Sequence, residues 1–178
     1  MKKLLLVPAL LVSFLASFSA FAIEGVAVID MRTAVLATQV SKATFTALEE
    51  ESEYAGNVEK AQLLNADRQA IAEKLQKDGE TLSQDEVAQM QKDIQEKTKD
   101  LEFLASKVQA AQEETAQRVF AESGPEMQKI IGELIAAKQI TVLLAKNETL
   151  LFSDPSLDLT DDVTSMLDVA ANEPASSE

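Results

Sequence analysis

The chain has 178 residues with 30 acidic and 16 basic side chains, which gives a formal net charge of −14 and a pI of about 4.4. It contains no Cys, no His and no Trp, and aromatic residues make up only 4%. The absence of Cys excludes a disulfide framework, so stability must come from helix packing or oligomerisation. The acidic balance argues against nucleic-acid binding, because phosphate contacts require a basic surface.

Residues 1–22 have the pattern of a secretory signal peptide. Two lysines precede a long uncharged apolar run, and Ala20 and Ala22 form a small-residue A-x-A cleavage pattern. We place cleavage after Ala22, which leaves 14 basic and 30 acidic residues and a net charge of −16 in the mature chain. An uncleaved anchor is the alternative, because the uncharged stretch just reaches the roughly 20 residues that span a bilayer. The signal places the mature protein in the periplasm.

A strand and two helices are predicted next. The short β-branched segment from Gly25 to Asp30 is typical of a strand. From Met31 to Lys77 the pattern is helical without an internal Pro, and Asp78-Gly79 supplies a helix stop. The segment Ser83-Gln84-Asp85-Glu86 is a capping box, which predicts that a second helix begins there. Two helices joined by so short a loop form an antiparallel hairpin.

Apolar residues in both helices recur at alternating spacings of three and four, as a coiled-coil seam requires. Folding the chain about residue 81 brings the two sets opposite each other. Arg68 and Lys97 interrupt the apolar layers, and we interpret them as long stems that reach from the seam to water. The hairpin is predicted to form an arm over residues 42–123 with its tip at 79–82. The predicted arm seam consists of Tyr54, Val58, Leu64, Ile71, Leu75, Val87, Met90, Ile94, Leu101, Leu104 and Val108.

Beyond the arm, Gly124-Pro125 predicts that the helix kinks or restarts. Residues 139–145 and 149–153 are apolar runs separated by a polar turn, which predicts a β-hairpin. Thr160 then heads a short helix with acidic residues in its first turn and with Val163, Met166 and Leu167 on one apolar face. The last residues, 171–178, have the composition of a disordered tail.

The strand near residue 26 and the two strands after residue 140 can meet only if the arm leaves a body and returns to it. The predicted fold is therefore mainly α, with a long antiparallel coiled-coil hairpin arm inserted in a small three-stranded β-containing oligomerisation body. That body comprises residues 23–41 and 124–170. It has little apolar surface to bury alone, so oligomerisation is expected to complete its core. The predicted body core consists of Val26, Val28, Ile140, Val142 and Leu144.

The composition disfavours an enzyme. Without His or Cys the chain lacks the commonest general base, metal ligand and thiol nucleophile. It has no Gly-rich phosphate loop, and its acidic runs are typical of a solvated helix face. We predict no catalytic residue, no cofactor and no metal.

These features together resemble the Skp/OmpH family of periplasmic outer-membrane-protein chaperones. The matching features are the signal peptide, the strand that leads directly into a helix at Met31, the capped hairpin, and the run from Ile140 to Phe152 followed by Leu159-Thr160-Asp161-Asp162-Val163. The resemblance implies a homotrimer whose body holds three arms around a cavity. It also implies that this cavity shields unfolded outer-membrane β-barrel proteins from aggregation without ATP.

One departure from the family concerns charge. Its well-known members are strongly basic, whereas this chain is acidic, so lipopolysaccharide binding is not expected and attraction of clients should depend less on long-range charge. Leu63 and Phe103 lie off the seam at a similar level of the arm, and they are the candidate client contacts. The alternative is that they are scattered surface residues without a role.

Two other classes of function stay open. A structural coiled-coil adaptor of the cell envelope would dock one folded partner and ignore unfolded chains. A membrane-surface protein is disfavoured by the negative charge, because lipid-binding helices usually carry basic residues on their polar face.

Overall fold

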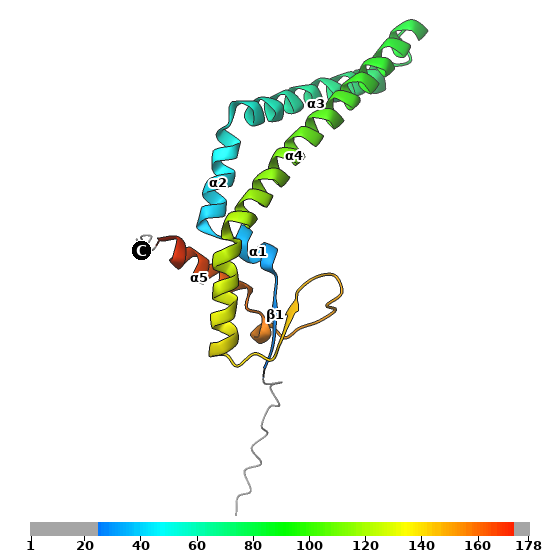
Figure 1. Cartoon of the computed structure of the whole chain (residues 1–178). Helices are drawn as coiled ribbons and strands as arrows, with labels where there is room; N and C mark the ends of the chain where they lie inside the picture. The colour runs from blue at the N-terminus through cyan, green and yellow to red at the C-terminus, as the bar shows by residue number, and fades with distance from the viewer. Residues whose placement is uncertain (1–24, 173–178) are drawn as a thin grey trace, which may run out of the picture.

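The computed structural model describes residues 25–172, so the predicted signal peptide and residues 173–178 lie outside the described part of the chain. The fold is mainly helical, with one long helix and a small two-stranded sheet (Figure 1). In chain order the elements are β1 (Val26–Ile29), α1 (Met31–Leu36), α2 (Gln39–Glu50), α3 (Ser52–Asp78), α4 (Gln84–Ala137), β2 (Val142–Ala145), the 3-10 turn η1 (Pro155–Leu157) and α5 (Thr160–Asn172).

The prediction of one continuous helix from Met31 to Lys77 is wrong, because α1, α2 and α3 divide this stretch. The first break is at Thr38, whose side chain caps α2 by accepting from the Ser41 N–H at 3.1 Å. The second is at Glu51, whose extended backbone (ψ 128°) separates α2 from α3. Four of the residues 49–53 are acidic, and the restart places Glu53 in the first turn of α3, where the helix dipole favours negative charge.

The capping box that starts α4 is confirmed. The Ser83 N–H donates to Glu86 Oε2 at 2.9 Å, and the Glu86 N–H donates to Ser83 Oγ at 3.3 Å. Of the two outcomes predicted at Gly124-Pro125, a kink or a restart, the restart is wrong, since Pro125 lies inside the 54-residue helix. Figure 1 shows α4 changing direction as it passes from the upper part of the molecule to the lower. Val119 and Met127, one on each side of Pro125, are buried in the same cluster, and this packing offsets the hydrogen bond that proline cannot make.

The sheet is smaller than predicted, and its strands are parallel. Val26 pairs with Val142 and Ile29 with Ala145. The predicted β-hairpin is wrong, because residues 149–153 form no strand. The Asn147 side chain instead accepts from the Thr149 N–H at 3.0 Å, which holds this segment in a local turn. Within the described residues, the other edge of β1 makes one isolated bridge, between Val28 and Asp158.

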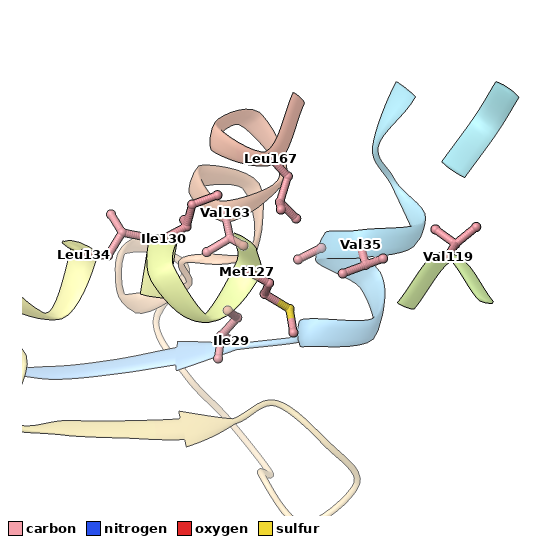
Figure 2. Close-up of a cluster of buried hydrophobic side chains, with 9 residues drawn as sticks. Ile29, Val35, Val119, Met127, Ile130, Leu134, Val163 and Leu167 are labelled. Carbon is pink, nitrogen blue, oxygen red and sulfur yellow. The ribbon is translucent and has the colours of Figure 1, made fainter. Parts of the chain in front are cut away.

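The core of the lower part of the molecule lies where α1, α4, α5 and one face of the sheet meet (Figure 2). Val35 and Val163 are fully buried there, and the predicted apolar face of α5 is confirmed by burial of Val163 and Leu167. The core cluster consists of Ile29, Ala34, Val35, Val119, Met127, Ile130, Leu134, Val163 and Leu167. We call this packed region, together with β2 and the loop that follows it, the body.

Candidate functional site

The most distinctive surface is the arm, which we define as α3 and the part of α4 that lies beside it (Figure 1). Side chains join the two helices at three levels. Lys97 Nζ lies 3.1 Å from Asp67 Oδ2, Lys107 Nζ lies 3.5 Å from Glu53 Oε1, and Gln112 Nε2 donates to the Tyr54 hydroxyl at 2.7 Å. From the Asp67–Lys97 contact to the Glu53–Lys107 contact, the residue number rises along α4 while it falls along α3, so the two helices run antiparallel.

The predicted seam residues are among the less exposed side chains of the arm. Leu104 is buried and the other ten are half-buried, while most residues between them are exposed. No residue of α3 is fully buried. The arm is therefore thin, and its apolar side chains are used chiefly to hold its two helices together.

The two charged seam positions differ. Lys97 reaches Asp67, as expected of a stem that extends from the seam. Arg68 Nη2 donates to Asn65 Oδ1 at 3.0 Å, but Arg68 Nε is buried without a partner among the described residues. The interpretation of a stem that simply reaches water therefore fits Lys97 and does not fit Arg68.

Leu63 and Phe103 are the large apolar side chains that the arm exposes, at 62% and 61%. The contact between Asp67 and Lys97 fixes the relative level of the two helices, and it places Leu63 and Phe103 within about one turn of each other along the arm. Lys107 Nζ lies 5.4 Å from the centre of the Phe103 ring, a cation–π distance. The arm thus exposes two large apolar side chains at a similar level, and a lysine lies beside one of them.

The predicted body-core residues are divided by the structure. Val28 is buried, Val26 and Ile140 are half-buried, and Val142 and Leu144 are exposed. Because Val26 pairs with Val142 and Val28 with Leu144, these four share one face of the sheet, opposite to the core cluster. Ile140 precedes β2 and is not in the sheet. One face of the sheet is therefore apolar and partly open.

The loop after β2 exposes two large apolar residues whose exposure the sequence analysis did not predict. Leu151 is 96% exposed and Phe152 is 82% exposed. They line a cavity of about 550 Å³ together with Lys146, Asp158 and other residues of the loop. The sequence signal for these two residues is the apolar run 149–153. That run predicts a strand, so its residues were expected to pair with a neighbouring strand. We call Val142, Leu144, Leu151 and Phe152 the open apolar surface of the body.

An ion pair connects the end of β2 to the start of α5. Lys146 Nζ lies 2.6 Å from Asp158 Oδ2, and Asp158 Oδ1 accepts from the Thr160 N–H at 3.0 Å. Partial burial raises the pKa of Asp158, but the hydrogen bonds from Lys146 and Thr160 and the charge of Lys146 outweigh it, so the pKa lies below its usual value. The hydrogen bond to Asp158 likewise raises the pKa of Lys146.

Within residues 25–172 no three His, Cys, Asp or Glu side chains are grouped in a way that could hold a metal ion. Over the same range, none of the helices has the length and apolar character needed to cross a membrane.

Comparison with known proteins identifies one family. Residues 25–167 match the family model described as outer membrane protein (OmpH-like). This range includes the whole arm and most of the body. A search of curated proteins gives no match. Among solved structures, the chain is similar to one described as an OmpH-like outer membrane chaperone from Caulobacter crescentus, with 23% identity over 82% of this chain and 85% of that chain and a TM-score of 0.45. The family assignment rests on the family model.

We predict that the Lys146–Asp158 pair makes stability depend on pH. A carboxyl whose native pKa is lowered contributes stability above its unfolded pKa of about 3.9, and this contribution is lost as the pH falls through the lower native pKa. The melting temperature of the wild type should therefore fall more steeply below about pH 4 than that of Asp158→Asn. The melting temperature is measured by circular dichroism at a series of pH values across this range. The control is Glu122→Gln, which removes an exposed carboxylate from α4. Equal slopes for wild type and Asp158→Asn would contradict the prediction.

Proposed function

The chain belongs to the OmpH-like family, and from this premise we propose that it is an ATP-independent holding chaperone for unfolded outer-membrane proteins in the periplasm. The observation that carries the proposal is the family match over residues 25–167, which spans both the arm and the body. The signal-peptide pattern of residues 1–22 supports export. We propose no enzymatic activity and no cofactor.

The shape of the arm supports this proposal. A long two-helix projection offers a large surface for its size, and an unfolded chain can be gripped along it without a preformed deep pocket. Because the seam uses most of the apolar side chains, a client meets a mainly polar wall with isolated apolar positions. Weak, distributed contacts of this kind suit a protein that must release its client without ATP.

We propose Leu63 and Phe103 as the client contacts of the arm. Both are more than half exposed, both belong to the same level of the arm, and neither is needed for the seam. Lys107 beside the Phe103 ring keeps the surface partly polar, which limits contact with other arms. An apolar client segment would cover the two side chains and remove them from water.

We further propose that the chain is a homotrimer assembled through the open apolar surface of the body. The support is the exposure of Val142, Leu144, Leu151 and Phe152, together with the second edge of β2, which pairs with no strand among residues 25–172. Such an edge with apolar neighbours is prone to pair with another chain. Assembly through the body leaves the arms outside the interface and available to clients.

The alternative function is a structural coiled-coil adaptor of the envelope that docks a folded partner. The observation that favours it is that the arm, within the described residues, exposes few large apolar side chains. An adaptor would bind one folded protein at a fixed site and would leave the aggregation of unfolded chains unchanged.

The proposed function is tested by diluting a urea-unfolded outer-membrane β-barrel protein into buffer and recording light scattering, with and without the mature protein and without nucleotide. We expect the mature protein to suppress aggregation of the barrel protein, and the suppression to become complete at a fixed molar ratio of the two proteins. An absence of suppression at a large excess of the protein would overturn the chaperone proposal and favour the adaptor.

The client contacts are tested with the double variant Leu63→Ser/Phe103→Ser. Burial of a large apolar side chain contributes about 1.5–3 kcal/mol, so loss of both contacts should raise the concentration needed for half-suppression by at least roughly tenfold. The control Gln62→Ser/Gln109→Ser changes two exposed polar residues of the arm. Both variants should melt close to the wild type. If the double variant suppresses aggregation as well as its control, Leu63 and Phe103 are not the contacts.

The assembly proposal is tested with Leu151→Ser/Phe152→Ser and mass measurement by light scattering after size exclusion. We expect the wild type to elute as a trimer and the variant to shift toward monomer, because the apolar area that the interface buries is reduced. Substitution of the exposed Thr46 and Ala47 of α2 by Ser is the control. A monomeric wild type, or an unchanged trimer in the variant, would count against this surface.

A further inference from the structure

The C-terminal helix makes a specific contact with the base of the arm. The backbone N–H of Gln39, the first residue of α2, donates to Asp168 Oδ1 of α5 at 2.7 Å, across 129 residues of sequence. In Figure 1 α5 lies close to the lower end of α2. Nothing in the local sequence of either helix indicates this contact.

The first N–H groups of a helix have no partner within the helix. In α2 two of them are satisfied from outside, because Thr38 Oγ1 accepts from Ser41 and Asp168 accepts from Gln39. The carboxylate also brings negative charge to the positive end of the helix dipole, which is favourable. Thus α2 has a local cap and a second cap supplied by a distant helix.

The helix that supplies the second cap is itself fixed. Leu167, the neighbour of Asp168, is buried in the core cluster together with Val163. Thr164 Oγ1 donates to the carbonyl oxygen of Ala34 in α1 at 3.0 Å. The carboxylate of Asp168 is therefore presented from a packed helix, and it connects α2 to the core.

Two stretches of chain connect the core cluster to the arm. On one side α2 lies between them, and breaks at Thr38 and Glu51 separate it from α1 and α3. On the other side α4 is continuous. Breaks in a helical stretch are where the chain bends most readily. A contact across the Thr38 break therefore restricts movement of α2, and of the arm that follows it, relative to the body.

We propose that Asp168 is a positioning residue that locks the base of α2 to α5 and so fixes the direction of the arm. When the carboxylate is removed, the first turn of α2 frays and the arm samples a wider range of directions. The proposal concerns the geometry of the chain alone, so it holds or fails independently of any client.

The test compares Asp168→Ala and Asp168→Asn with Asp161→Ala, which removes an exposed carboxylate from the first turn of the same helix. Hydrogen exchange, followed by mass spectrometry, reports how readily the backbone hydrogen bonds at the start of α2 open. We expect about fivefold faster exchange there in Asp168→Ala, the effect of losing one helix cap. Asp168→Asn retains an acceptor oxygen and should lie between Asp168→Ala and the wild type. Asp161→Ala should match the wild type.

Arm direction is measured by the distance between spin labels at Thr81→Cys on the tip and Ser165→Cys on α5, with labelled protein diluted into unlabelled protein. The chain has no native Cys, so labelling is specific. The distance distribution should broaden in Asp168→Ala while the melting temperature stays close to that of the control. An unchanged distribution, or faster exchange throughout the body and not only in α2, would overturn a positioning role for Asp168.

Discussion

The parallel pairing of β1 with β2 is the constraint on which the rest of the structure depends. Parallel neighbours cannot be joined by a tight turn, so the chain must leave the end of β1 and return to the start of β2 by a crossover. Here the crossover is the whole of α1 to α4, which includes the arm. The sheet therefore closes the body and, at the same time, anchors both ends of the projection.

The arm and the body follow different rules of packing. In the body, helices from both ends of the chain surround fully buried side chains such as Val35 and Val163. In the arm, two helices share one seam in which almost every side chain keeps some exposure. A two-helix projection has too little volume to enclose a core, and it gains surface in return. A holding chaperone needs that surface, which links the proposed function to the thinness of the arm.

The acidic surface sets limits on how such a protein attracts its clients. With a net charge of −14, long-range attraction would select basic chains, whereas the apolar positions of the arm act only at contact. The contact of Asp168 with α2 shows that individual carboxylates also have structural roles at helix ends. Overall charge and the function of single acidic residues are therefore separate questions in this chain.

The strand at β1, the capping box at Ser83 and the apolar face of α5 could be predicted from the amino-acid sequence, because each depends on neighbours within a few residues or on a helical period. The sequence did not determine the breaks at Thr38 and Glu51, the continuity of α4 through Pro125 or the parallel partner of β1. These depend on contacts between residues far apart in the chain. The burial of Val119 and Met127 in one core keeps α4 intact, and β1 accepts β2 as its partner because the crossover brings them together. Tertiary packing decided these features, since local propensity is small beside the free energy of a shared core.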